Sequence, residues 1–543
     1  MFHLKNNCIT EGGCHVLAAA LNSNPSNLTE LDLSENKLGN PGMKIILTLF
    51  ENVQCRLEKL NLKNNCITEG GCHVLAAALN SNPSNLTELD LSENKLGNPG
   101  MKIILTLFEN VQCRLEKLKL NCISITDEGC AALASAFNSN LRELDLSRNQ
   151  IGDSGVTEIS SLLRNSQTLQ MLSLKNNCIT EGGCHVLAAA LNSNPSNLTE
   201  LDLSENKLGN PGMKIILTLF ENVQCRLEKL NLKNNCITEG GCHVLAAALN
   251  SNPSNLTELD LSENKLGNPG MKIILTLFEN VQCRLEKLKL NCISITDEGC
   301  AALASVFNSN LRELDLSRNQ IGDSGVTQIS SLLRNSQTLQ MLSLYVCDIT
   351  DVSSLTQSLT NTKALQFLKE LDLRGNEIGD SKQKLIDVLR DSNCKLSYDF
   401  DKCNREVRLS TVDSNERVTY DTAEDPDLFF TYNPPPPPHV GPSGTANSEN
   451  VSDTVDGCIG VIGHKIIKAV VAIILEHLVD KQLKKDCYGC QGVVDGVLCD
   501  LRDEMYIVEG LAELRTKLVD ETCEQAIYDA VDSWKKSTPS DSD

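Results

Sequence analysis

The chain has 543 residues, of which 41% are hydrophobic and 3% are aromatic, and its formal net charge is −22 at pH 7. This acidic balance argues against sequence-independent nucleic-acid binding, which requires Lys and Arg to neutralise phosphates. Because Leu, Ala and Val supply most of the hydrophobic residues, the composition favours a thin layered core over a bulky globular one.

A leucine-rich pattern organises the first three quarters of the chain, and residues 28–38 spell one unit of it, L-x-x-L-x-L-x-x-N-x-L. Leu31 and Leu33 lie two apart on a short predicted strand, so both side chains point to the same side and are expected to be buried. Asn36 then turns the chain inward, where its amide satisfies backbone groups that the turn leaves unpaired. The pattern predicts one rung of a solenoid.

The second core leucine recurs at spacings of 28 or 29 residues, with two intervals of 26, which gives about 13 repeats. A repeat of this length has room for a strand and a helix. Residues 11–21 carry apolar side chains at helical spacing, and residues 42–50 form a second predicted helical segment of this kind. The thirteen leucines are Leu31, Leu60, Leu89, Leu118, Leu144, Leu172, Leu201, Leu230, Leu259, Leu288, Leu314, Leu342 and Leu371.

The copying between repeats is nearly literal, because the block 4–173 recurs at 174–343. This identity indicates a recent tandem duplication or a gene model that joined copies. Identical rungs cannot individually encode distinct sites, so specificity is expected where copying stops. The chain also begins inside a rung, and we expect it to be truncated relative to a longer ancestor. Two positions differ between the blocks, Ala136 against Val306 and Glu158 against Gln328.

The remainder of the chain divides into three parts. Residues 401–458 are rich in Asp, Ser, Thr and Pro and are interpreted as a disordered acidic linker. Within it, Pro434 to Pro438 is either a plain spacer or a ligand for an SH3 or WW domain. Residues 459–535 form a predicted small α-helical module, followed by a disordered tail at 536–543. The apolar stretch at 461–478 is interrupted by charged residues, so we predict no membrane span.

The cysteines allow one metal hypothesis. Cys487 and Cys490 have C-x-x-C spacing, and a tetrahedral zinc ion would need two further ligands, for which Cys499, Cys523 and His477 are candidates. The same thiols also fit an ordinary helical core. Most of the 24 cysteines occupy recurring apolar positions, so we expect reduced thiols rather than a disulfide framework. With no signal-peptide pattern at the start, the expected location is the cytoplasm.

The outward residue before the second core leucine alternates in charge along the repeats, beginning with Glu30, Lys59, Glu88 and Lys117. Adjacent parallel strands lie ~4.8 Å apart, so opposite charges are expected side by side on the concave face. One interpretation is a ladder that neutralises itself, and the other is a protein-binding surface. The two are compatible.

Candidate partner-binding residues lie where the copying ends, because Tyr345 begins a segment that replaces the Lys-Asn-Asn sequence of Lys175 to Asn177. Tight interfaces usually rely on Trp, Tyr or Arg anchors, and the only tryptophan, Trp534, lies in the C-terminal part. No group resembles a nucleophile with its base, so an enzyme is not predicted. The concave-face candidates are Asp315, Arg318, Tyr345, Glu370, Asp372 and Arg374.

The alternating forms L-x-x-L-D-L-S-x-N-x-L-G and L-x-x-L-x-L-K-N-N-C-I-T-E-G-G-C resemble the ribonuclease-inhibitor subclass of leucine-rich repeats, closest to the C-terminal repeats of NOD-like receptors. The resemblance spans roughly residues 2–400 and implies an α/β horseshoe, with a parallel sheet inside and helices outside, over a domain at 1–400. Ile123 and Ile293 depart from it by replacing the turn asparagine, so their turns are expected to use other hydrogen bonds. No Walker A motif, the sign of a NACHT domain, is present.

For function, the resemblance implies a non-catalytic protein-interaction scaffold, similar to the ligand-sensing region of innate-immune NOD-like receptors. Its protein partner would bind on the concave face, with no cofactor. The alternative is an adaptor that acts through the C-terminal helical module, stabilised by zinc at Cys487 and Cys490, with the repeats as a spacer.

Overall fold

A computed structural model describes residues 2–23, 27–81, 85–133, 140–194, 197–251, 255–305, 310–390 and 392–398. Within these ranges the chain forms one parallel sheet whose fifteen strands follow each other in chain order. The strands are β1 (Phe2–His3), β2 (Glu30–Asp32), β3 (Lys59–Asn61), β4 (Glu88–Asp90), β5 (Lys117–Lys119), β6 (Glu143–Asp145), β7 (Met171–Ser173), β8 (Glu200–Asp202), β9 (Lys229–Asn231), β10 (Glu258–Asp260), β11 (Lys287–Lys289), β12 (Glu313–Asp315), β13 (Met341–Ser343), β14 (Glu370–Asp372) and β15 (Lys395–Ser397).

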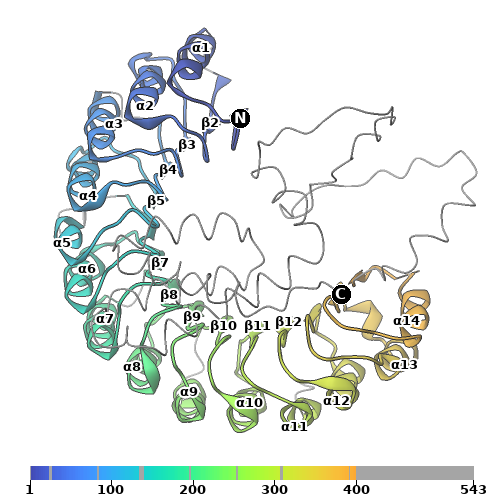
Figure 1. The fold of residues 1–543 in the computed structure, drawn as a ribbon. Helices are drawn as coiled ribbons and strands as arrows, with labels where there is room; N and C mark the ends of the chain where they lie inside the picture. The colour runs from blue at the N-terminus through green and yellow to red at the C-terminus, as the bar shows by residue number, and fades with distance from the viewer. Residues whose placement is uncertain are drawn as a thin grey trace, which may run out of the picture. The chain divides into compact units, whose positions relative to one another are not determined.

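Helices follow the strands and lie on the outer side of the repeat unit, while the strands line its inner side (Figure 1). They are α1 (Glu11–Asn22), α2 (Gly39–Leu47), α3 (Glu69–Ser81), α4 (Gly97–Leu105), α5 (Asp127–Cys130), α6 (Asp153–Asn165), α7 (Glu181–Ser193), α8 (Gly209–Leu217), α9 (Glu239–Ser251), α10 (Gly267–Leu275), α11 (Asp297–Cys300), α12 (Gly322–Asn335), α13 (Ser353–Asn361) and α14 (Ser381–Leu389). Short 3₁₀ segments are η2 (Thr48–Glu51), η3 (Thr106–Glu109), η5 (Thr218–Glu221), η6 (Thr276–Glu279), η7 (Ala301–Ser305) and η8 (Ala364–Gln366).

The predicted parallel-sheet solenoid with outer helices is confirmed over the described repeats. The thirteen predicted core leucines lie on β2 to β14, and β1 and β15 extend the sheet by one strand at each end. Leu31 and Leu33 are fully buried, as the alternation of a strand requires. The helical segment predicted at 42–50 begins earlier, at Gly39, and its last turn tightens into the 3₁₀ segment η2.

The turn asparagines of alternate rungs join each of these rungs to the one before it. The side-chain Oδ1 of Asn94 accepts the backbone N–H groups of Asn65 at 3.0 Å and Ile67 at 2.9 Å. Its Nδ2 donates to the carbonyls of Leu62 in the preceding rung and Leu91 in its own rung, both at 2.9 Å. The same contacts to the preceding rung recur at Asn36, Asn149, Asn206, Asn264, Asn319 and Asn376.

Most asparagines of the intervening rungs are used differently, and this bears on Ile123 and Ile293. In these rungs a backbone carbonyl accepts from the preceding rung: Gly39 N–H donates to the Asn65 carbonyl, and Gly97 N–H donates to the Ile123 carbonyl, both at 2.9 Å. The Oδ1 of Asn65 is buried and has no hydrogen-bond partner within the described part of the chain, whereas that of Asn177 accepts the Ile151 N–H at 3.1 Å.

The turns at Ile123 and Ile293 differ in their hydrogen bonds, as expected. The Nδ2 of Asn65 donates to the Leu33 carbonyl at 2.8 Å, and an isoleucine cannot make this bond. An isoleucine still fits at position 123, because the equivalent carbonyl of Leu91 accepts from Nδ2 of Asn94 at 2.9 Å.

This difference gives a matched pair of variants. Asn94→Ala removes one acceptor and one donor that serve buried backbone groups of two rungs, so we expect the free energy of unfolding to fall by about 3 kcal/mol. Asn65→Ile, the substitution that the chain itself carries at Ile123, is expected to cost less than about 1 kcal/mol, because the Leu33 carbonyl that loses Nδ2 of Asn65 keeps Nδ2 of Asn36 at 2.8 Å. Urea unfolding of both variants measures the difference, and equal losses would contradict the two roles.

Candidate functional site

The charge alternation on the concave face forms real ion pairs. Glu30 lies opposite Lys59, and Lys59 lies opposite Glu88 in the parallel register, which confirms the predicted side-by-side order. Each side chain remains partly exposed, so one such pair contributes at most ~1 kcal/mol. The face is largely self-neutralised. The closest Nζ–Oε distances are 2.6 Å for Lys117–Glu143, 2.9 Å for Lys287–Glu313, 3.0 Å for Lys229–Glu200, 3.5 Å for Lys395–Glu370 and 3.6 Å for Lys59–Glu88.

A second row of ion pairs lies just beyond the ends of the strands, and sequence reasoning missed it. The lysine of the K-N-N spelling pairs with the glutamate of the S-E-N spelling in the next rung, as in Lys175–Glu205 at 2.9 Å. The signal was present in the recurring pair of spellings one rung apart. The other members are Lys5–Glu35 at 3.2 Å, Lys63–Glu93 at 3.1 Å and Lys233–Glu263 at 3.0 Å.

Tyr345 interrupts this second row, because it occupies the repeat position that Lys175 occupies earlier in the chain. The guanidinium carbons of Arg318 and Arg374, from the rungs on either side, lie 5.6 and 5.9 Å from the centre of the Tyr345 ring. Both distances are within the range of cation–π attraction. We call Arg318, Tyr345, Val346, Arg374 and Gly375 the Tyr345 surface.

Gly375 occupies the position of Glu205 and brings the backbone against the tyrosine. Its φ of +71° lies in the left-handed region that favours glycine. A Cβ atom there would lie 3.1 Å from Cε2 of Tyr345 and would overlap a methyl carbon of Val346. The glutamate of the copied ion pair is thus replaced by a residue that leaves room for the ring.

Asp372 fixes the position of Arg374 within the Tyr345 surface. Its Oδ2 accepts from Nη2 of Arg374 at 2.8 Å, and its Oδ1 accepts from Nε at 3.1 Å and from the Arg374 backbone N–H at 3.0 Å. Asp372 is 7% exposed, whereas the Arg374 side chain is 49% exposed. The carboxylate is therefore a buried support, and the guanidinium faces the surface.

The other two candidates lie on the strands and have their own partners. Oδ1 of Asp315 on β12 accepts the backbone N–H of Ser317 at 3.0 Å. Glu370 on β14 pairs with Lys395 at 3.5 Å. The structure therefore brings Arg318, Tyr345, Asp372 and Arg374 together and leaves Asp315 and Glu370 outside this cluster.

A concave hollow lies over β8 to β11 and is lined largely by charged side chains. Burial raises the pKa of Asp202 there, and the nearby carboxylate of Asp260 adds to the rise. The pKa of Asp90 is also raised, chiefly by burial. Because the same residues recur in the first block, this hollow does not distinguish one part of the chain from another. Its lining is Glu200, Leu201, Asp202, Lys229, Leu230, Asn231, Glu258, Asp260 and Lys289.

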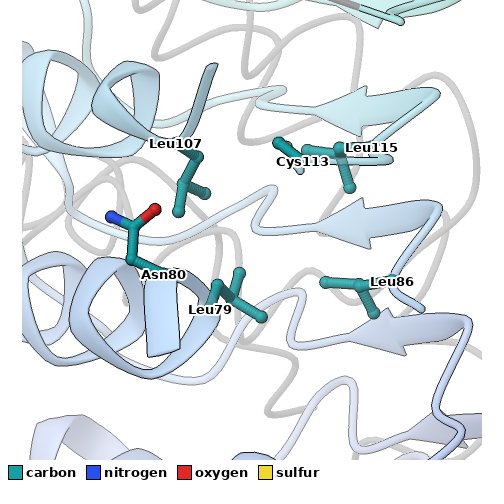
Figure 2. A pocket seen from close by; sticks show the side chains of 6 residues that line it. All are labelled: Leu79, Asn80, Leu86, Leu107, Cys113 and Leu115. Carbon is teal, nitrogen blue, oxygen red and sulfur yellow. The ribbon is translucent and has the colours of Figure 1, made fainter. Parts of the chain in front are cut away.

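A small apolar hollow lies between the helices and the chain that leads into the strands. In Figure 2 its lining side chains converge from α3, η3 and the segments before β4 and β5. Burial raises the pKa of the Cys113 thiol in this lining. The hollow recurs at the equivalent residues of another repeat, so it belongs to the packing of the repeat. The two linings are Leu79, Asn80, Leu86, Leu107, Cys113 and Leu115, and Leu191, Asn192, Leu198, Leu219, Cys225 and Leu227.

Several predicted features lie outside the described residues and stay predictions. They include the linker, the helical module and the tail after residue 400, the proline run at 434–438, and the zinc candidates. Within the described ranges, no group of three or more His, Cys, Asp or Glu side chains is placed to hold a metal ion. No helix among the same residues has the length and apolar character needed to cross a membrane. The zinc candidates are Cys487, Cys490, Cys499 and Cys523.

Comparison with known proteins agrees with this architecture. The Ribonuclease inhibitor of Sus scrofa is 36% identical over 405 residues, which cover 72% of this chain and 74% of that protein. NACHT, LRR and PYD domains-containing protein 3 of Rattus norvegicus is also 36% identical over 405 residues, which cover 72% of this chain and 27% of that protein. The Leucine Rich repeat family model matches residues 24–46, 82–104, 137–160, 194–216, 252–274, 307–330 and 364–381.

The strand-and-helix rungs, the asparagine contacts and the family match define a leucine-rich repeat protein. Within that class, the chain belongs to the ribonuclease-inhibitor-like family, and its repeats are also similar to those of NACHT, LRR and PYD domains-containing proteins. It spans about a quarter of the length of the rat relative, because it matches 27% of that protein. The predicted family resemblance is confirmed.

Two aspartates hold the turn that follows the Tyr345 surface. Partial burial by itself would raise the pKa of Asp323, but hydrogen bonds from the Thr350 hydroxyl and from the backbone N–H groups of Asp351 and Thr350 outweigh it and lower the pKa. These bonds measure 2.6 Å from the hydroxyl, 2.9 Å from Asp351 and 2.8 Å from the Thr350 N–H. Hydrogen bonds from Ser353 chiefly lower the pKa of Asp351.

The lowered pKa values predict acid sensitivity of these rungs. A carboxyl group whose folded-state pKa is depressed stabilises the fold above its unfolded pKa, and this stability is lost as the pH falls through the folded value. We therefore expect the urea unfolding midpoint to fall as the pH is lowered from about 5 to about 2. Asp323→Asn is expected to lower the midpoint at the higher pH, so that the midpoint of this variant depends less steeply on pH. An unchanged slope in Asp323→Asn would contradict the assignment.

Proposed function

We propose that the chain is a non-catalytic protein-interaction scaffold and that its specific contact is the Tyr345 surface. One observation carries the proposal: the ion-pair row built on Lys175 and its copies is replaced there by an aromatic ring between two guanidinium groups. Tyr and Arg are the side chains most enriched among energetically dominant interface residues. The concave face of the copied blocks repeats and is largely self-neutralised.

The backbone at this surface supports a role other than folding. Val346 has a φ of +51°, and asparagines occupy the same rung position at Asn64, Asn176 and Asn234 with similar positive φ values. Asparagine adopts this region readily, whereas a β-branched residue is strained in it. Val346 is nevertheless 38% exposed. A strained and exposed apolar residue beside Tyr345 fits a contact surface, because unfavourable backbone conformations concentrate at functional sites.

The relatives set the biological context of the proposal. We propose that the chain acts in the same way as the ligand-sensing repeats of innate-immune NOD-like receptors. We also propose that it is located in the cytoplasm. The described cysteines are free thiols, which suits a reducing compartment. One relative is named for inhibiting ribonuclease. We propose a different protein partner for this chain, because the described strands contain one aromatic residue, Phe2 of β1, and so offer few anchors.

A binding screen with matched variants tests the site. With the full chain as bait and a displayed protein library as the source of binders, Tyr345→Ala is expected to weaken selected binders by about tenfold or more, because buried aromatic anchors contribute about 2 kcal/mol. Lys175→Ala, at the equivalent position 170 residues earlier in the chain, is the control and is expected to leave affinity unchanged. Binders that never respond to Tyr345, Asp372 or Arg374 substitutions would remove the site.

A further inference from the structure

The Tyr345 surface differs in charge from its counterpart 170 residues earlier in the chain. There the equivalent positions hold Arg148, Lys175 and Glu205, with Lys175 and Glu205 joined at 2.9 Å. At the Tyr345 surface, beyond the end of the copied blocks, the lysine becomes Tyr345 and the glutamate becomes Gly375, while Arg374 replaces a serine, Ser204. One lysine and one glutamate are lost and one arginine is gained. The net charge of these positions is therefore one unit more positive than in the earlier counterpart, and the carboxylate of Glu205 has no equivalent.

The two guanidinium groups are held in place before any ligand arrives. Arg374 is fixed by Asp372, and both arginines lie within 6 Å of the Tyr345 ring centre, at 5.6 and 5.9 Å. A planar guanidinium that is already oriented loses less conformational freedom when it binds an oxyanion in bidentate geometry. Both side chains are exposed enough to meet a ligand, since Arg318 is exposed and Arg374 is 49% exposed.

An apolar element lies next to these cations. Val346 is 38% exposed and the Tyr345 ring is half-buried, so a ligand group can contact carbon atoms while its anion faces the arginines. The formal net charge of −22 opposes a polyanion such as a nucleic acid, which needs many cations along its length. A single carboxylate needs only the local pair.

We propose, building on the protein-interaction function above, that the Tyr345 surface binds a side-chain carboxylate of an acidic protein segment that carries an apolar residue beside the acid. Arg318 and Arg374 receive the carboxylate oxygens through charge-assisted hydrogen bonds. Val346 and the tyrosine ring contact the neighbouring apolar side chain. The proposed partner is thus an acidic peptide segment, which binds locally to a protein whose own net charge is negative.

A peptide pair tests the charge requirement directly. The probe is a fluorescein-labelled peptide of repeated Glu-Glu-Leu, and its control has Gln in place of Glu. Fluorescence anisotropy with the full chain is expected to show binding of the acidic peptide and at least about tenfold weaker binding of the control, because hydrogen bonds to a charged group are stronger than those to a neutral amide. The affinity for the acidic peptide is expected to fall as salt rises.

Two arginine variants separate the surface from general charge. Arg318→Ala is expected to weaken the acidic peptide by about tenfold, whereas Arg148→Ala, the same residue facing Lys175 in the first block, is expected to leave it unchanged. Arg318→Lys keeps the charge but loses the planar fork, so intermediate binding is expected. Equal binding of the Gln peptide, no binding of the acidic one, or an equal loss in Arg148→Ala would overturn the inference. If one of these results is obtained but protein binders still depend on Tyr345, the proposed function is retained and only the carboxylate partner is excluded.

Discussion

The asparagine amide of every second rung is the contact on which the described repeats depend. Each rung is a strand of two or three residues, and such a short strand leaves buried backbone groups at the turn that follows. Asn94 and its equivalents supply an acceptor for two N–H groups of the preceding rung and a donor for its carbonyl. The intervening rungs make fewer such contacts, as at Asn65, whose Nδ2 donates to the Leu33 carbonyl, so the structural repeat consists of two rungs.

This two-rung unit explains why one chain tolerates both literal copying and local change. Positions that accept two backbone N–H groups of the preceding rung through a side chain keep asparagine, from Asn36 to Asn376. Positions whose backbone carbonyl accepts a glycine N–H of the preceding rung carry Asn65, Ile123 or Cys347 at equivalent places. Side chains beyond the strand ends are free of this constraint, so Tyr345 replaces a lysine there without disturbing the sheet.

Much of the fold could be predicted from the chain alone, because the leucine period and the strand alternation determine which side chains are buried. Leu31 and Leu33 show this directly. The charge ladder of Glu30 and Lys59 also followed from the strand spacing. The pattern identified Tyr345 as a departure, but not its position between Arg318 and Arg374, because those contacts depend on loop conformations with positive φ. The Lys175–Glu205 row was missed although its two spellings recur one rung apart.

The copied block provides the most direct test of the claim that rungs build the fold and departures from copying provide specificity. Tyr345→Lys, Val346→Asn, Arg374→Ser and Gly375→Glu together convert the Tyr345 surface into the sequence found 170 residues earlier, at Lys175, Asn176, Ser204 and Glu205. Asp202 accepts the backbone N–H of Ser204 there, so Asp372 is expected to tolerate the change.

We predict that this fourfold variant unfolds at the same urea concentration as the parent chain, or a higher one, because asparagine relieves the strained backbone at position 346. Binders selected on the parent chain are expected to lose their affinity for it. Retained binding with an unchanged unfolding midpoint would contradict the account.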